Sequence, residues 1–265
     1  MPLTVLPGTS HREDDMPLDP EVLAGLWRME ESHFWHRARN RWIVRALRER
    51  GIAPGARILE VGCGSGAVAI ELHRQGYRVT GIDTADVLVR KAYERCPDAS
   101  FVIGDVAELP ESEGPFDAIA FFDVLEHLDA PRALLVAALR LARPGACVIA
   151  TVPALRSLHT VIDDLSGHKM RYEPGELTAL FAAANVSDVE EHGIFRAIWP
   201  LIRLARARAR TQASSRKEIL LADTVVPPRV LNETFELLCR LELAVAFKES
   251  KNRRGPSILA MGVAP

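Results

Sequence analysis

Short apolar runs alternate with amphipathic segments along the middle of the chain. The runs at 57–61, 79–82, 100–103, 116–122 and 147–152 consist mostly of apolar and β-branched residues, and four of them end at a glycine or an aspartate. Runs of this length predict buried strands, and the segments between them predict helices. Strands that alternate with helices build a mostly parallel sheet that helices cover on both faces. We therefore predict an α/β domain.

The C-terminal part of the chain departs from this alternation. Apolar runs at 241–247 and 257–263 flank the polar segment 248–256, which predicts a pair of strands rather than another strand–helix unit. The sheet would then end in a strand antiparallel to the others. Before this pair, the segment 175–193 predicts a helix and a connection, and 194–240 predicts a mainly helical insertion.

A polar, proline-bearing tail at 1–18 precedes the first predicted helices and is predicted to be partly mobile. Residues 19–50 carry aromatic residues at helical spacing, which predicts leading helices. The remainder, 51–265, is then one enlarged domain with substrate-side insertions at about 154–175 and 194–240. The length of 265 residues suits one such domain rather than two.

The most specific motif is Glu-Val-Gly-Cys-Gly-Ser-Gly, which begins at Glu60 and joins the first strand to a helix. Glycines let the backbone turn sharply and approach a ligand, and the free N–H groups of the following helix attract polar groups. Two cofactors fit at this point. The glycines and Ala67, with Asp83 downstream, satisfy a relaxed dinucleotide fingerprint. A carboxylate so near the turn suits a cofactor with an ammonium and a sulfonium better than one with two phosphates.

The motif resembles motif I of the class I S-adenosylmethionine (SAM) dependent methyltransferases. The segments 123–127 (Asp-Val-Leu-Glu-His) and 167–172 (Gly-His-Lys-Met-Arg-Tyr) resemble the small-molecule branch of type 11/12/23-like enzymes, which includes the ubiquinone-biosynthesis methyltransferases. The resemblance implies a Rossmann-like fold with a seven-stranded, mostly parallel sheet, an antiparallel last strand and helices on both faces. It also implies that the chain binds SAM and releases S-adenosyl-L-homocysteine.

The resemblance places the cofactor at the carboxyl ends of the first four strands. Asp83 would accept hydrogen bonds from both ribose hydroxyls, and Asp105 would contact the adenine amino group beside Val106. The resemblance also implies that the leading helices at 19–50 form a lid, which would cover SAM with Trp35 and pair its carboxylate with Arg39. The expected cofactor residues are Glu60, Gly62, Cys63, Gly64, Gly66, Asp83, Thr84, Asp105, Val106, Phe122, Asp123, Trp35 and Arg39.

Two histidines near the ends of the fourth and fifth strands are the predicted catalytic bases. Histidine takes a proton at neutral pH because its unperturbed pKa is ~6.5, which makes His127 and His168 candidates for deprotonating an acceptor. The predicted substrate-binding residues are His33, Arg171 and Tyr172.

Structural roles compete with several of these assignments. His33 lies beside aromatic residues, where histidines often only pack. Arg171 could order its loop by pairing with Asp163 or Asp164. Asp83 could cap the helix that follows it. The two adjacent aspartates could also suggest a metal, but no other ligand cluster accompanies them, and we predict no metal.

The implied reaction is SN2 transfer of the SAM methyl group to a small-molecule acceptor, with oxygen or nitrogen favoured over carbon, in a natural-product or envelope-metabolite pathway. A nicotinamide (NAD) dependent oxidoreductase on the same topology is one alternative, and a non-catalytic SAM-binding scaffold is another. Neither the acceptor nor the oligomeric state follows from the residues.

The composition of the chain limits the kinds of partner that it can be expected to bind. The net charge of −2 gives no reason to expect nucleic acid. Four cysteines without Cys-x-x-Cys spacing indicate neither zinc nor a disulfide framework, and no apolar stretch reaches ~18 residues, so we predict a cytoplasmic protein without a transmembrane segment. Arginines recur at helical spacing within 201–210, where a peripheral membrane contact or an acidic acceptor is the functional alternative to a solvated helix face.

Overall fold

The computed structural model describes residues 3–7, 19–202, 215–247 and 254–265. Its strands are β1 (Thr4–Val5), β2 (Arg57–Val61), β3 (Arg78–Asp83), β4 (Ser100–Ile103), β5 (Phe116–Phe122), β6 (Ala142–Pro153), β7 (Ser187–Ile194) and β8 (Ser257–Val263). Its helices are α1 (Pro20–Ser32), α2 (Phe34–Glu49), α3 (Ala67–Arg74), α4 (Asp86–Arg95), α5 (Pro131–Leu139), α6 (Val161–Leu165), α7 (Glu176–Ala183), α9 (Arg216–Asp223) and α10 (Arg229–Ala246).

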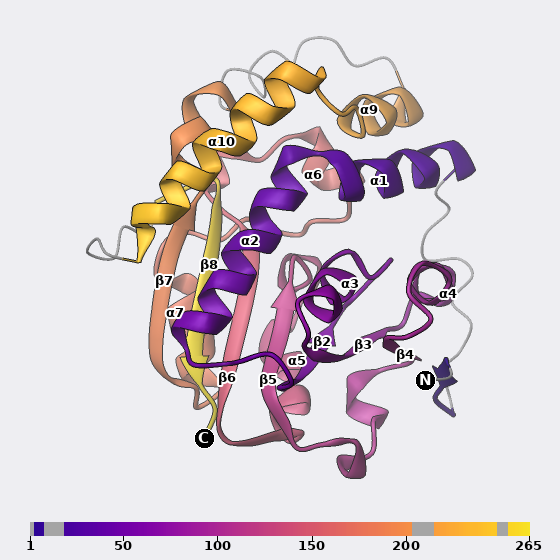
Figure 1. Ribbon diagram of the computed structural model, residues 1–265, viewed down its shortest axis with the longest axis vertical. Helices are drawn as coiled ribbons and strands as arrows, with labels where there is room; N and C mark the ends of the chain where they lie inside the picture. The colour runs from indigo at the N-terminus through magenta and orange to yellow at the C-terminus, as the bar shows by residue number, and fades with distance from the viewer. Residues whose placement is uncertain (1–2, 8–18, 203–214, 248–253) are drawn as a thin grey trace.

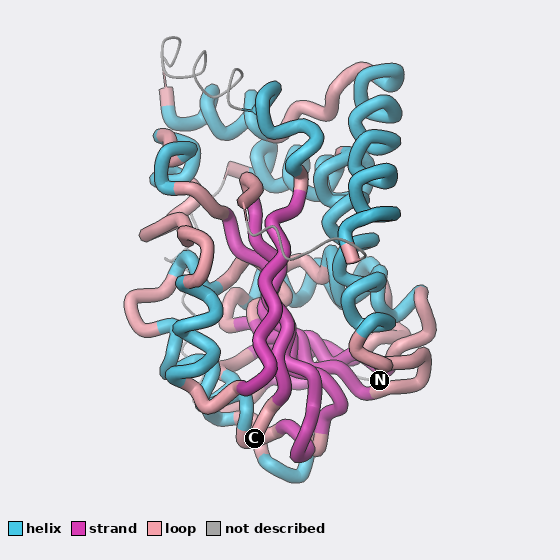
Figure 2. The backbone as a smooth tube through the Cα atoms, turned by 90° about the vertical axis from the view of Figure 1, so that its left-hand side faces the viewer, coloured by secondary structure: helices cyan, strands magenta, loops and turns pink. Residues whose placement is uncertain are grey.

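All strands belong to one sheet in the order β1-β4-β3-β2-β5-β6-β8-β7 (Figure 1). The strands from β1 to β6 pair in parallel, whereas β8 runs antiparallel to both β6 and β7. Helices flank the twisted sheet on both sides (Figure 2). The predicted Rossmann-like sheet with an antiparallel last strand is therefore confirmed.

The described part of the chain contributes eight strands to this sheet rather than seven, because part of the expected tail forms β1 at the edge. Thr4 pairs with Val102 of β4, and Leu6 is buried in the space that the missing side chain of Gly104 leaves open. Residues 8–18 of the tail lie outside the described residues.

The predicted strand at 241–247 is wrong, since the chain up to Ala246 continues α10. Phe235, Leu238, Cys239, Leu243 and Ala246 of this helix recur at helical spacing and pack on the core. A helix buries such a stripe without a sheet partner. The polar loop expected after it lies largely outside the described residues.

The second partner of β8 is β7. This strand lies largely in the segment 175–193, for which the sequence predicted only a helix and a connection. Its sequence is polar because its first residues are exposed and because the buried Glu191 caps the neighbouring helix α7. This buried carboxylate accepts hydrogen bonds from the backbone N–H groups of Gly175, at 2.7 Å, and Thr178, at 2.6 Å. The free N–H groups at the start of α7 thus find acceptors in a residue of β7. A strand that carries such a polar residue lacks the apolar pattern by which it would be predicted.

Two apolar cores fill the layers on either side of the sheet. One lies beneath α2, α3, α4 and α10, and the other beneath α5 and α7. Trp42 of α2 is 1 % exposed, and its neighbours on the helix line the same core. Of the two helices within 19–50, α2 thus packs on the first core. No described helix has the length and apolar character needed to cross a membrane.

Asn232 of α10 holds the junction between α1 and α2. Its Oδ1 accepts a hydrogen bond from the N–H of Phe34, and its Nδ2 donates one to the carbonyl of Ser32, both at 2.8 Å. The side chain is buried, so water cannot replace these bonds easily. The angle between the leading helices therefore depends on a residue about 200 positions away.

We expect Asn232→Ala to lower the free energy of unfolding by ~1–3 kcal/mol, because it leaves backbone groups of the α1–α2 junction without partners. Urea denaturation followed by circular dichroism measures the change. Glu233→Ala on the exposed side of the same helix is the matched control and should cost less than ~0.5 kcal/mol. Equal stability of the two variants would contradict the bridging role.

Candidate functional site

A cavity of about 200 Å³ lies between the glycine-rich turn after β2 and the two leading helices. Trp27 and Glu30 of α1, His36 of α2 and Leu88 of α4 contribute to its wall. It opens at the carboxyl ends of the parallel strands, where ligands bind in open α/β sheets. Of the predicted cofactor residues, those that line it are Glu60, Gly62, Cys63, Gly64, Phe122, Asp123 and Arg39.

The turn requires its glycines. Gly62, Gly64 and Gly66 have φ angles of 76°, 50° and 78°, in the left-handed region that side chains disfavour. A Cβ at Gly62 would overlap the side chain of Val124, and one at Gly66 would lie 2.8 Å from the Cβ of Ala92. The turn is thus held close to both the β5 end and α4.

Asp83 braces this turn at the end of β3. Its Oδ2 accepts a hydrogen bond from the N–H of Gly64 at 2.8 Å, and its Oδ1 accepts one from the N–H of Ala85 at 2.9 Å. Burial raises the pKa of this carboxyl, against the opposing effect of the backbone donors. The contact with Ala85 is local to the turn before α4, whose N-cap residue Ala85 receives no side-chain cap, so Asp83 does not cap this helix.

Glu60 is the most strongly perturbed carboxyl at the cavity. It is 2 % exposed, and its Oε2 has no hydrogen-bond partner among the described residues. Burial raises its pKa from 4.5 to about 8, although the nearby Arg39 guanidinium acts in the opposite direction. A buried carboxylate needs a cation or a donor, and the cavity beside it can hold one.

Arg39 joins the lid to the sheet. Its guanidinium forms an ion pair with Asp123 at the end of β5, where the Thr151 hydroxyl also donates a hydrogen bond at 3.0 Å. Asp123 has a φ of 53° and is therefore held in a conformation that few residues adopt. The Nε of Arg39 is buried without a partner among the described residues, which leaves one donor for an anionic group in the cavity.

A second contact between lid and turn was missed by the sequence analysis. Ser65 in the turn donates to both carboxylate oxygens of Glu30 at 2.5 and 2.6 Å, and Arg95 of α4 donates to the same carboxylate at 2.7 Å. These residues lie 30 to 65 positions apart. No periodicity links them, so only the folded chain shows that α1 is fastened over the turn.

The remaining predicted cofactor residues do not line the cavity. The Oδ1 of Asp105 accepts a hydrogen bond from the N–H of Ala107 at 2.9 Å, Val106 is buried and Thr84 is exposed. Trp35 stacks on Phe195, with ring centres 3.7 Å apart. Gly66 lies in the turn itself. Trp35 thus packs against the segment after β7.

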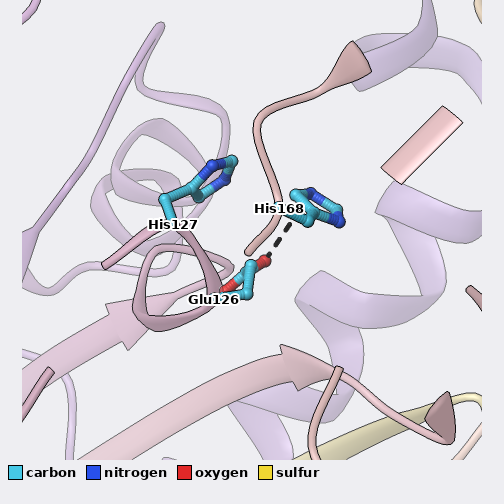
Figure 3. A group of neighbouring side chains, drawn as sticks. All are labelled: Glu126, His127 and His168. Carbon is cyan, nitrogen blue, oxygen red and sulfur yellow. Dashed lines mark ion pairs between the residues drawn. The ribbon is translucent and has the colours of Figure 1, made fainter. Parts of the chain in front are cut away.

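Glu126, His127 and His168 meet beyond the end of β5 (Figure 3). The first two lie in the short helical turn η3 (Leu125–His127), and His168 lies after α6. The Nδ1 of His127 lies 3.2 Å from the carbonyl of Gly167, and the Nδ1 of His168 lies 3.1 Å from a carboxylate oxygen of Asp163. Both partners are acceptors, so each Nδ1 carries the proton and each Nε2 of the neutral ring keeps a lone pair.

Glu126 is fully buried, and neither carboxylate oxygen has a hydrogen-bond partner among the described residues. Burial and the nearby Asp123 carboxylate hold its pKa well above the usual range. Its Oε1 lies 4.0 Å from the Nε2 of His168 (Figure 3). With His127, these groups place three potential metal-ligand atoms within 4.8 Å of one another, a cluster that the sequence analysis did not consider when it predicted no metal.

The predicted substrate-binding residues all make structural contacts. Arg171 donates to Asp163 through Nε at 2.9 Å and Nη2 at 2.6 Å, and the Tyr172 hydroxyl lies 3.3 Å from the carbonyl of Leu125. His33 caps α2, and its Nδ1 accepts from the N–H of Trp35 at 3.1 Å. Burial lowers the pKa of His33 to about 4. A substrate contact for these residues stays a prediction.

Residues 34–193 match the model of a family described as methyltransferase domain. The chain belongs to this methyltransferase family. It is 30 % identical over 193 residues to a ubiquinone biosynthesis O-methyltransferase of Xanthomonas campestris, across 66 % of this chain and 77 % of that relative. A ubiquinone biosynthesis O-methyltransferase of Xylella fastidiosa is 41 % identical over 96 residues, which cover 34 % of this chain and 39 % of that one.

Solved methyltransferase structures share the fold of this methyltransferase. A putative sarcosine dimethylglycine methyltransferase from Galdieria sulphuraria superposes with a TM-score of 0.59 at 14 % identity, over 92 % of this chain and 97 % of that one. Phosphoethanolamine N-methyltransferase 2 of Haemonchus contortus, in complex with S-adenosylhomocysteine, gives a TM-score of 0.56 at 18 % identity, over 95 % and 59 % of the two chains.

The family establishes the class of reaction. The methyltransferase uses SAM to methylate a small molecule. The oxidoreductase and scaffold alternatives are not favoured. The unpartnered Glu60 oxygen and the unpartnered Arg39 Nε fit a cofactor that ends in an ammonium and a carboxylate, and the glycine turn leaves room for backbone contact.

We expect the stability of the ligand-free methyltransferase to fall as pH rises from 4.5 towards 8. A carboxyl whose pKa is about 8 when folded and 4.5 when unfolded binds more protons in the folded state across this window. The unfolding free energy then decreases by up to ~1.4 kcal/mol per pH unit from this group. Urea denaturation at several pH values, compared with Glu60→Gln, isolates the contribution of Glu60. Parallel pH curves for the two proteins would exclude it.

Proposed function

We propose that this methyltransferase transfers the methyl group to a hydroxyl oxygen of its acceptor. The observation that carries the proposal is the fixed tautomer of His127, whose Nδ1 donates to Gly167 and whose Nε2 keeps its lone pair beside the end of β5. A hydroxyl must lose a proton as it attacks, and a neutral imidazole can accept it. The O-methyltransferase names of the relatives point in the same direction.

In this proposal the cofactor is held by cavity residues together with residues at the ends of β3 and β4 that do not line the cavity. Asp83 holds the ribose hydroxyls, and Asp105 with Val106 borders the adenine. Glu60 faces the ammonium, and Arg39 faces the carboxylate through its unpartnered Nε. This orientation of the cofactor is supported because its ammonium and its carboxylate then each meet a buried group of opposite charge. The α1 helix, fastened through Glu30, excludes water from above.

When bound, SAM would supply a methyl group activated by its sulfonium, with the thioether of S-adenosylhomocysteine as the leaving group. The protein contributes position and proton transfer. His127 accepts the hydroxyl proton at Nε2, and the carbonyl of Gly167 keeps its ring oriented. Burial and His168 lower the pKa of His127, so the base is neutral and ready at physiological pH.

His168 is the second base in this proposal, and the loop that carries it is ordered by Asp163. This carboxylate is 1 % exposed and binds both His168 and Arg171. Arg171 thereby acts on the site through Asp163 rather than through the acceptor. Tyr172 contacts the carbonyl of Leu125 in the turn that bears His127, so it supports the same site from below.

We infer that the reaction takes place in the cytoplasm. The four cysteines are free, three of them buried, and thiols persist in a reducing compartment. The arginines expected to contact a membrane or an acidic acceptor, from position 203 onward, lie outside the described residues.

Asp83→Ala should weaken SAM and S-adenosylhomocysteine binding by roughly tenfold or more, because it removes a charged acceptor for the ribose hydroxyls and a brace of the turn. Isothermal titration calorimetry measures both ligands, with NADH as a comparison. Asp98→Ala, at an exposed position outside the cavity, is the control and should bind SAM as the unchanged protein does. Unchanged affinity in Asp83→Ala would remove this residue from the cofactor site.

His127→Gln should lower kcat by ~10²–10⁴ with hydroxyl acceptors while SAM affinity stays within about twofold. Methylation of a panel of phenols, catechols, alcohols and amines with labelled SAM identifies the acceptor class. With the unchanged enzyme, activity should fall in acid with a midpoint below the usual histidine pKa of 6.5, since the pKa of His127 is lowered. Methylation of amines alone, with no loss in His127→Gln, would refute the oxygen assignment.

A further inference from the structure

The outer face of α10 exposes an apolar stripe. Val230, Leu237, Leu241 and Val245 are 76 %, 56 %, 59 % and 47 % exposed. Their spacing of seven and four residues places them on one side of the helix. Figure 1 shows α10 crossing the outside of the molecule beside α2. Single exposed apolar residues are ordinary, but several on one side of a helix mark a binding surface, although Glu233 and Thr234 interrupt the row after Val230.

A ridge of arginines runs along one flank of this stripe. Glu236 of α10, whose side chain is 3 % exposed, pairs with Arg37 and Arg41 of α2 and with Arg240 of its own helix. Three guanidiniums share this one carboxylate, so positive charge remains. Arg45 extends the ridge, and its guanidinium lies 5.9 Å from the ring centre of Phe247 at the end of α10.

The arginine ridge (Arg37, Arg41, Arg45 and Arg240) is accessible as well as charged. Its side chains are between 35 % and 54 % exposed. Besides Glu236, only Glu49 neutralises it among the described ion pairs, through Arg45. Four cations therefore face two carboxylates beside a row of exposed leucine and valine side chains, which is the pattern of a helix that lies in a membrane interface.

We propose that the α10 stripe and the arginine ridge dock on the surface of an anionic lipid bilayer. The leucines and valines enter the boundary between headgroups and acyl chains, and the arginines bind lipid phosphates through paired N–H donors. The charges disfavour a dimer in which the α10 helices of two copies pack against each other. An antiparallel pair of α10 helices would set ridge against ridge, and like charges in contact oppose pairing.

The proposed docking face is connected to the lid helices α1 and α2 by direct contacts. Asn232 of the same helix bonds both sides of the α1–α2 junction, and α2 carries Arg39 into the cofactor cavity. The bilayer surface therefore lies next to the helices that cover the site, without touching the residues that the proposed reaction uses.

The test is co-sedimentation of the full chain with phosphatidylcholine vesicles, with and without phosphatidylglycerol, at low and high salt. The unchanged protein should bind only the anionic vesicles and should be released by salt, since screening weakens the contribution of the arginines. Leu241→Asp should lose roughly tenfold or more of this partitioning. Val136→Asp, at a 51 % exposed site on α5 beneath the other face of the sheet, is the matched control and should bind as before.

Arg45→Gln provides a second variant that leaves the stripe intact, and it should reduce binding to anionic vesicles only. Thermal unfolding confirms that each variant is folded. The proposal fails if the unchanged protein ignores anionic vesicles, if Leu241→Asp binds them equally well, or if neutral vesicles bind as strongly. It also fails if sedimentation velocity shows a dimer that Leu241→Asp dissociates, because the stripe would then be an interface between copies of the chain.

Discussion

The Arg39 guanidinium is the cation around which the carboxyl ends of the central strands are arranged. It forms an ion pair with Asp123 and opposes the rise in pKa that burial imposes on Glu60 and Glu126. Three acidic groups at one end of a sheet repel one another in a medium of low polarity. A single buried guanidinium from α2 reduces that repulsion and at the same time fixes the lid over the site.

The lid itself is held from two directions. Glu30 fastens α1 to the glycine turn through Ser65 and Arg95, and Asn232 fastens the α1–α2 junction to α10. Each contact is a hydrogen bond to a buried or half-buried partner, where the cost of leaving a donor unpaired is high. The cavity is therefore bounded by elements that come from three distant parts of the chain.

In the proposed mechanism, the Nδ1 contacts of the two histidines leave the Nε2 atoms free for proton transfer. A carbonyl and a carboxylate accept the Nδ1 protons of His127 and His168, which fixes the tautomer and leaves both Nε2 atoms basic. An ionised Glu126 attracts an imidazolium close by, because Coulombic attraction is strong in a medium of low polarity. Burial and the nearby Asp123 carboxylate raise the pKa of Glu126, so a neighbouring cation is what favours its ionised form.

The sequence alone determined the parallel core of the sheet and the glycine turn, because local strand, turn and helix preferences act over a few positions. It also predicted Glu60 and Asp123, which line the cavity, and Asp83, which contacts the turn. It failed for β7, whose polar Glu191 caps α7, and for the C-terminal part of α10, whose apolar residues suit a strand equally well. Only the tertiary structure decided which cation meets which carboxylate. The pairings Arg39–Asp123, Glu30–Ser65 and Asp163–His168 bring together different elements or opposite ends of a loop, and their strength depends on burial that no local pattern records.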